Sequence, residues 1–175
     1  YYIEVFDDDF TTDSATQVLT GFSGSTYSGY SHIEGKSVKV IRDDIVDPDH
    51  TVSGGNVTAG GQPQLYLEAG LNYDVEVKTN PVETRLSSGT IASQKKRILE
   101  ITPNLYKSQN LVINNRTIDL ASGPLSGAGG VQTFTGKKRT HGFLGYDRDG
   151  VITISQNEPV FLTLLSLAYK VSLGQ

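Results

Sequence analysis

The sequence predicts an all-β protein, built as an antiparallel β-sandwich or as two small β subdomains. Several short segments alternate apolar and polar residues with period two, which is the pattern of a strand with one buried and one exposed face; they are residues 37–40, 64–67, 74–78 and 150–155. No comparably long stretch has the apolar spacing of a helix. The 19 glycines fit the many turns that such a fold requires.

Two glycine-containing segments stand between expected strands. Ser53-Gly54-Gly55-Asn56 separates residues 51–52 from 57–58, and Asp147-Arg148-Asp149-Gly150 leads into residues 151–154. Because glycine adopts positive φ at little cost, both segments are predicted to be tight hairpin turns.

A polar stretch at residues 80–95 divides the expected strands into two sets. We therefore expect an amino-terminal β subdomain at 1–83, a linker at 84–95 and a carboxy-terminal β subdomain at 96–175. The second set opens with strands at 97–102 and 111–113. It closes with the most apolar segment, 158–171, whose β-branched and aromatic residues favour a strand in the core or at a subunit interface.

Composition limits the classes of protein that fit. The 175 residues suffice for one well-buried domain or two small ones. The absence of cysteine excludes disulfides and thiolate metal sites. No apolar run approaches the roughly 20 residues of a membrane span, so no membrane segment is expected. Methionine is absent even at position 1, which suggests a segment excised from a longer protein.

The net charge of −4 argues against non-specific nucleic-acid binding, which needs clustered lysine and arginine.

Two groups of aspartates are the candidates for acid/base chemistry. They are Asp7, Asp8 and Asp9, and then Asp43, Asp44, Asp47 and Asp49. A carboxylate pair of the glycosidase kind could come from either group, but the clustering is more typical of turns and solvated loops. The segment 147–150 resembles the start of a calcium loop, yet the further ligands and the terminal glutamate are absent.

No other motif predicts a catalytic or cofactor site. His32, His50 and His141 lie far apart and lack the i, i+4 partner of a metal-binding helix, although a zinc site from all three stays open. The glycine-rich stretch 122–130 lacks the lysine and hydroxyl residue of a phosphate loop. Residues 21–24 fall short of a nucleophile elbow. We therefore predict no catalytic, cofactor-binding or metal residue, and no enzyme.

Five segments, in their order and spacing, resemble a known family. They are residues 2–4, 30–40 (Tyr-Ser-His-Ile-Glu-Gly-Lys-Ser-Val-Lys-Val), 52–57, 69–73 and 145–159. Together they resemble the carboxy-terminal β-rich part of podovirus tail nozzle proteins, of the tail tubular protein B kind. Two positions differ from that family's pattern: Asp43-Asp44 stands where Asp-Gly is more usual, and Tyr30 stands where leucine is common.

The resemblance implies a structural role in the virion. Such nozzle proteins form a hexameric ring in the phage tail, close the DNA exit channel and let the genome out at infection. The implied partners are copies of the same chain, other tail or portal-adaptor proteins, and exiting DNA in transient contact without sequence-specific binding. A ring of this kind uses head-to-tail contacts, so each subunit needs two different complementary faces.

The motif residues are expected to be structural. Gly35, Gly54, Gly55 and Gly70 are predicted to serve turns or close backbone approach. His32 and Glu34 are predicted to hydrogen-bond across a hairpin or at a subunit contact, with a local partner favoured.

Two alternatives belong to other functional classes. The first is a β-sandwich carbohydrate or receptor-binding module of a phage tail. Its nine tyrosines and six phenylalanines could supply a sugar-stacking platform; Tyr1, Tyr2, Tyr27, Tyr30 and Tyr66 are among them. The absence of tryptophan, the strongest stacking residue, counts against it. The second is a tail enzyme that degrades polysaccharide through an Asp/Glu pair. We rank the structural role first, binding second and the enzyme third.

Overall fold

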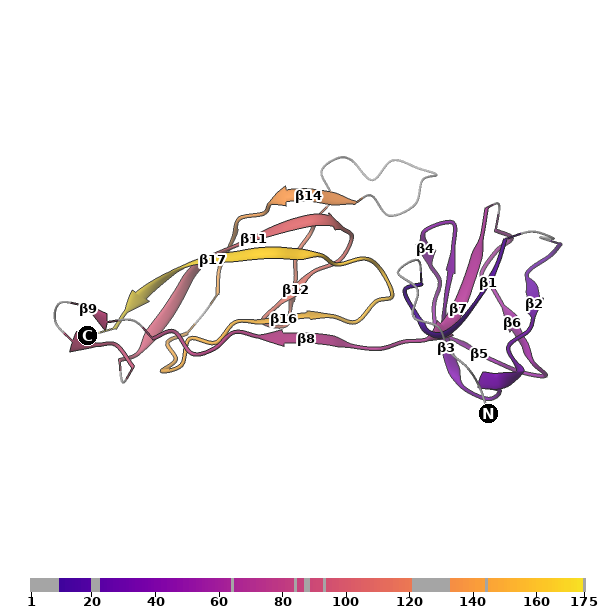
Figure 1. Cartoon of the computed structure of the whole chain (residues 1–175), viewed down its shortest axis with the longest axis horizontal. Coiled ribbons are helices and arrows are strands. Elements are labelled where there is room, and N and C mark those ends of the chain that lie inside the picture. Colours follow the sequence, from indigo (N-terminus) through magenta and orange to yellow (C-terminus); the bar gives the residue numbers. More distant parts are fainter. Residues whose placement is uncertain are drawn as a thin grey trace. The chain divides into compact units, whose positions relative to one another are not determined.

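The computed structural model describes residues 10–19, 23–63, 65–83, 85–86, 89–92, 94–120, 133–143 and 145–174. The described residues form antiparallel strands and one short 3₁₀ turn, η1 (Ser31–Ile33), which confirms the all-β prediction (Figure 1). No helix in this part of the chain has the length and apolar character that crossing a membrane requires.

The chain divides into two compact units. Unit 1 comprises residues 1–74, 126–132 and 157–160, and unit 2 comprises 75–125, 133–156 and 161–175. The change of unit thus comes at Asp74–Val75, before the polar stretch from which the sequence suggested a linker. Residues 84–95 belong to unit 2, and the two short strands β9 (Arg85–Leu86) and β10 (Gly89–Thr90) pair within them.

Unit 1 consists of two sheets around one core. Its strands are β1 (Asp13–Val18), β2 (Thr26–Ser28), β3 (Ser37–Arg42), β4 (Ile45–Val46), β5 (His50–Thr51), β6 (Asn56–Thr58) and β7 (Leu67–Leu71). The larger sheet has the order β1-β7-β3-β4, with β5 also on β3, and β2 pairs with β6 in the smaller. Strand β7 begins at Leu67 and not at residue 64, so the sequence pattern placed this strand too early.

The β3–β4 connection is a two-residue turn made by Asp43 and Asp44. Their φ angles are 51° and 66°, so both residues occupy the left-handed region. Hairpins with two-residue loops favour this geometry, and aspartate is among the residues that tolerate it. The tight turn therefore forms here without glycine.

The core of unit 1 is built from alternate residues of its strands. Val38 and Val40 on β3 point inward, as the period-two pattern predicts. Tyr30 is completely buried with them, and its hydroxyl donates to the backbone oxygen of Thr16. The remaining buried members of this cluster are Tyr27, Ile33, Val52, Val57, Ala59, Leu67 and Ala69.

Unit 2 contains the longer strands. They are β8 (Val75–Lys78), β11 (Lys96–Ser108), β12 (Val112–Ile113), β13 (Arg116–Thr117), β14 (Phe134–Lys137), β15 (Thr140–His141), β16 (Thr153–Gln156) and β17 (Leu164–Leu173), besides β9 and β10. One sheet has β11 at its centre, with β14 and β15 on one side and β17 on the other. The other has the order β13-β12-β16-β8.

The two four-stranded sheets of unit 2 share one core. Ile98, Ile101 and Leu105 from β11 belong to the same buried cluster as Ile113 from β12 and Ile154 from β16. Figure 1 shows the layer of β11, β14 and β17 separate from the layer of β12, β16 and β8. Unit 2 therefore has the sandwich architecture that the sequence predicted.

The apolar carboxy-terminal segment forms the strand β17, as expected, but it is not deeply buried. Leu164 and Leu167 pack against the core, whereas Leu165 is 60% exposed. Among the described residues, β17 pairs with β11 alone, so it ends the sheet.

The turn at residues 147–150 forms, but it is a corner and not a hairpin. The Asp147 carboxylate accepts hydrogen bonds from the backbone amides of Arg148 (2.7 Å) and Gly150 (3.1 Å). The preceding strand, β15, lies in the β11 sheet, and the following one, β16, lies in the other sheet. The buried Lys96 fixes this corner, because its Nζ donates to the backbone oxygen of Arg148.

Replacement of Gly70 by alanine tests the close approach of β1 and β7. A Cβ at Gly70 would clash with Thr12 Oγ1 and lie 2.7 Å from the backbone oxygen of Asp13. We expect Gly70→Ala to lower the free energy of unfolding by about 1 to 3 kcal/mol in urea denaturation. Gly61→Ala is the matched control, since its Cβ would meet nothing closer than 3.5 Å. Equal stability of Gly70→Ala and the wild type would contradict the close approach.

The buried Tyr30 makes stability depend on alkaline pH. Burial, and to a smaller extent the Glu68 carboxylate, raises the pKa of Tyr30 from 10.0 to about 12. A group whose pKa is higher in the folded state contributes stability below its unfolded pKa and loses it as pH rises through the folded value. We expect the difference in unfolding free energy between wild type and Tyr30→Phe to shift in favour of the variant from pH 10 to pH 12. A difference independent of pH in this window would refute the assignment.

Candidate functional site

Glu34, in the central sequence motif, binds the turn between β5 and β6. Both carboxylate oxygens of Glu34 accept backbone hydrogen bonds, from Gly54 (2.8 Å) and Gly55 (2.7 Å). The two glycines have φ angles of 60° and 72°, which suit a tight turn. Glu34 thus fixes a hairpin turn, one of the two roles that the sequence suggested for it.

The three histidines have separate environments. His32 Nε2 lies 2.9 Å from the backbone oxygen of Ser14, and His141 Nδ1 lies 3.8 Å from Glu100. His50 Nε2 is buried and has no hydrogen-bond partner in the described part of the chain. Within the described residues, no three histidine or acidic side chains are grouped so that they could hold a metal ion.

The aspartates of the second candidate group bind local partners. Asp43 Oδ1 accepts from the amides of Leu65 and Tyr66, and Asp44 accepts from the Tyr66 hydroxyl at 2.6 Å. Burial, together with the hydrogen bond to Asp44, raises the pKa of Tyr66.

Asp47 and Asp49 are paired with cations. Asp47 Oδ1 binds Arg42 Nε at 2.9 Å, and Asp49 Oδ1 binds Lys39 Nζ at 2.8 Å. The hydrogen bond from Lys39 to Asp49 raises the pKa of Lys39. Asp7, Asp8 and Asp9 lie outside the described residues.

Two of the tyrosines named for a sugar-stacking platform lie in the core. Tyr27 and Tyr30 are buried, so their rings have no free face for a sugar. They are buried because both belong to the apolar cluster of unit 1, which the sequence pattern did not indicate. Tyr1 and Tyr2 lie outside the described residues.

The charges of the protein are segregated between its two units. Unit 1 contains 13 acidic and 3 basic side chains, a net charge of −10, whereas unit 2 contains 6 acidic and 12 basic ones, a net charge of +6. The sum is the −4 of the whole chain. The two units therefore have net charges of opposite sign, which the net charge of the whole chain does not indicate.

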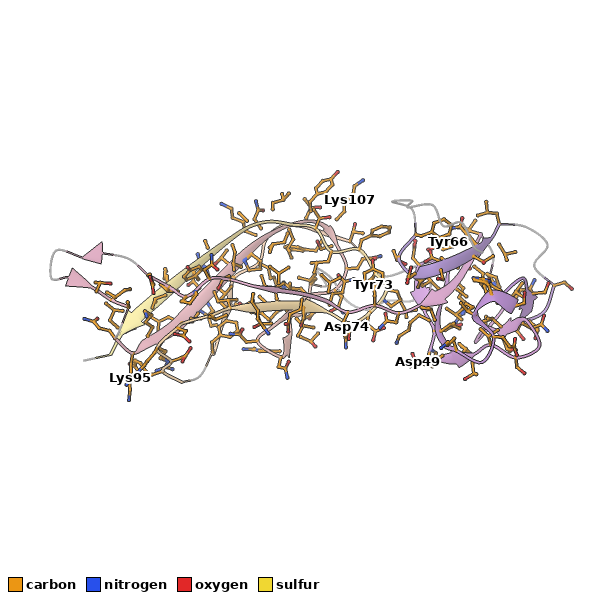
Figure 2. All side chains as sticks on the ribbon, turned by 60° about the horizontal axis from the view of Figure 1, so that its bottom comes forward. Asp49, Tyr66, Tyr73, Asp74, Lys95 and Lys107 are labelled. Carbon is orange, nitrogen blue, oxygen red and sulfur yellow. The ribbon has the colours of Figure 1, made fainter. Side chains whose placement is uncertain are left out.

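Part of the positive charge lies on the outer surface of the β11 sheet. Lys137 is on β14, His141 is on β15, and Arg139 lies in the connection between these strands. Arg139 and His141 both lie beside Glu100 of β11. Lys170 on β17 and His141 both pair with Glu100, from opposite sides of β11. Lys107, which is labelled in Figure 2, lies near the end of β11 at a φ of 44°, where the pairing with β14 is irregular. We name the other four residues, Lys137, Arg139, His141 and Lys170, the basic face.

A single carboxylate lies among the cations of the basic face. Glu100 is within 3.4 Å of Arg139 Nε and 3.5 Å of Lys170 Nζ. Its side chain is 13% exposed, whereas those of Arg139 and Lys170 are 68% and 69% exposed. Glu100 holds these cations on the sheet, while Lys107 and Lys137 have no ion pair with it.

The two cations of β3 bind carboxylates from the loops of unit 1. At mid-strand, Lys39 binds Asp49 and Glu158, the latter at 3.2 Å, and Arg42 at the end of the strand binds Asp47. Asp49 is labelled in Figure 2, as is Tyr66, whose hydroxyl donates to Asp44 in the turn after β3.

Comparison with known proteins assigns the chain to no group. No protein-family model matches it, and no curated protein matches its sequence.

The sequence reasoning missed the segregation of charge because it used only the net charge of the whole chain. The signal was present: counting charges separately before and after residue 75 would have shown it. Only the strand pairing, however, brings Lys137 and Lys170 onto one sheet.

Removal of the Glu34 carboxylate tests its contribution to the turn at Gly54 and Gly55. Glu34→Ala leaves the amides of Gly54 and Gly55 without their acceptor, and we expect a loss of about 1 to 2 kcal/mol in unfolding free energy, measured in urea. Glu34→Gln retains one acceptor oxygen and should lose less. A Glu34→Ala variant as stable as the wild type would show that Glu34 does not stabilise this turn.

Proposed function

We propose that the chain is a structural component of a short phage tail, a nozzle subunit that assembles with copies of itself into a hexameric ring. This ring closes the DNA exit channel in the virion and lets the genome out at infection. Other tail or portal-adaptor proteins would flank it, and exiting DNA would touch it transiently without sequence-specific binding.

The observation that carries this proposal is the opposite charge of the two units. A ring built from head-to-tail contacts needs two different and mutually complementary faces on each subunit. Units of net charge −10 and +6 supply such a pair of faces within one chain. The ordered segments that resemble nozzle proteins supply the identity of the assembly.

The environment of the carboxylates supports a structural role over an enzymatic one. Asp43 and Asp44 bind the segment of Leu65 and Tyr66, and Asp47 and Asp49 bind Arg42 and Lys39. These contacts fix turns and strands. We therefore propose that the chain is not an enzyme.

The solution mass of the chain tests the assembly. We expect size-exclusion chromatography with light scattering, over a wide range of protein concentration at low ionic strength, to detect a species near six chains. The monomer mass at every concentration would contradict assembly through this segment. A glycan-array screen should be run on the same sample, because monomers that bind a glycan would favour the carbohydrate-binding alternative.

A further inference from the structure

We propose that β17 pairs with β17 of a second copy of this chain, antiparallel and about a two-fold axis at Tyr169. The proposal names the free edge of the β11 sheet as an interaction surface and the same edge of another copy as its partner. It goes beyond the proposed ring, because a two-fold contact joins chains in pairs and closes no ring.

The free edge of β17 is long and has little protection against pairing. Among the described residues, the ten residues of β17 pair with β11 on one side and with no strand on the other (Figure 1). The strand contains no proline, and Lys170 is its only charged residue. Natural sheet edges are usually blunted by proline, charges or bulges. Here the register with β11 shifts once along β17, at Leu165, so the regular edge is 166–173.

The hydrogen bonds of β11 show which backbone groups of β17 face the free edge. The backbone oxygen of Pro103 accepts from the amide of Lys138 (3.1 Å), so it points away from β17. Leu167 lies opposite Pro103, and its own N–H and C=O therefore point to the free edge. The amide of Gly174 donates to the backbone oxygen of Lys95 (2.7 Å), toward β11, which gives the same alternation. The residues whose backbone groups lie at the edge are Leu167, Tyr169, Val171 and Leu173.

The sequence of this edge is nearly a palindrome about Tyr169. Residues 165–173 are Leu-Ser-Leu-Ala-Tyr-Lys-Val-Ser-Leu. When two antiparallel copies cross at Tyr169, leucine lies opposite leucine at the ends, serine lies opposite serine, and Leu167 lies opposite Val171. Directly opposite residues share one face of a sheet, so apolar side chains meet apolar ones and hydroxyls meet hydroxyls. This self-complementarity identifies a second copy of β17 as the partner.

The same register also satisfies the backbone. Leu167, Tyr169 and Val171 all have their N–H and C=O groups at the edge, and the register places these residues opposite one another. Antiparallel strands exchange two hydrogen bonds at each such pair, so the three pairs would form about six. A shift by one residue would place these groups opposite residues that bind β11, and would move every side chain to the other face.

The exposure of Tyr169 is explained by a missing neighbour at the edge. Tyr169 lies opposite Ile101, which is completely buried, yet Tyr169 is 38% exposed. Leu167, on the same face of the sheet, packs against the core of unit 2. A second β17 would cover Tyr169 with the same apolar side chains, and the removal of that surface from water favours the contact.

The one charge of the strand does not oppose the contact. Lys170 Nζ lies 3.5 Å from Glu100 of its own chain, on the outer face of the sheet. In the proposed register Lys170 lies opposite the small side chain of Ala168 and not opposite another cation. The ion pair with Glu100 is therefore kept in the dimer.

Introduced cysteines test the register, because the chain has none of its own. Ser166→Cys in one copy would lie opposite Ser172→Cys in the other, with Cα atoms about 4.5 Å apart, which a disulfide can bridge. Two copies of residue 166, or two of residue 172, would lie about 20 Å apart. We expect a mixture of the two variants to form a disulfide-linked dimer under mild oxidation, and either variant alone to form none.

A charge placed on the two-fold axis tests the contribution of the edge. Tyr169→Lys would bring two like charges together at the centre of the contact, and lysine is a residue that blunts natural edges. Tyr106→Lys is the matched control, because Tyr106 is 46% exposed and lies on β11, away from this edge. Urea denaturation shows that both variants are folded.

Light scattering at high ionic strength measures the dimer, since salt screens contacts between charged surfaces and leaves strand pairing. We expect wild type to form a two-chain species as protein concentration rises. Tyr169→Lys should raise the dissociation constant of this species at least about tenfold, and Tyr106→Lys should leave it unchanged.

Three outcomes would overturn the proposal. A six-chain species that dissociates directly to monomers in salt would keep the ring and exclude the pairing of β17. Disulfide formation by Ser166→Cys alone, as efficient as in the mixture, would exclude this register. Wild type that is monomeric at every concentration and ionic strength would overturn both the ring and the pairing, and would leave a strand of another protein as the remaining partner for this edge.

Discussion

The pairing of β11 with strands on both of its sides is the interaction on which unit 2 depends. Its thirteen residues pair with β14 and β15 along one edge and with β17 along the other. Ile98, Ile101 and Leu105 then point into the core, and Glu100 points to the opposite face. The core and the basic face thus lie on the two sides of the sheet that β11 centres, so loss of its pairing would remove both.

Unit 1 depends instead on its tight turns. The carboxylate of Glu34 holds the turn at Gly54 and Gly55, and the aspartate turn at 43–44 reverses the chain after β3. Hydrogen bonds from backbone amides to carboxylates are stronger than those between neutral groups. Many of the acids of unit 1 therefore have a structural task besides giving the unit its negative charge, which explains how an acidic unit of this size remains compact.

The segregation of charge changes the interpretation of the chain's net charge. A value of −4 is typical of a protein that does not bind polyanions, but it is the sum of +6 and −10 on two separate units. Each unit presents its own field to a partner within a Debye length, about 8 Å at physiological ionic strength. The sign of the charge on the local surface, and not the net charge of the whole chain, decides which partner binds there.

The sequence by itself determined the fold class, most of the strands and the turns. Period-two alternation at 37–40 and the glycine pair at 54–55 depend on neighbouring residues, so a local pattern predicts their structure. The alternation at 74–78 predicted the strand β8, but not that all four of its residues are exposed. The tertiary structure alone decided which strands pair, that residues 147–150 turn a corner between two sheets, and that Tyr27 and Tyr30 enter the core. It also brought Arg139 and Lys170 to one carboxylate, Glu100. The reason is that these features depend on contacts between residues far apart in the sequence, which no local pattern specifies.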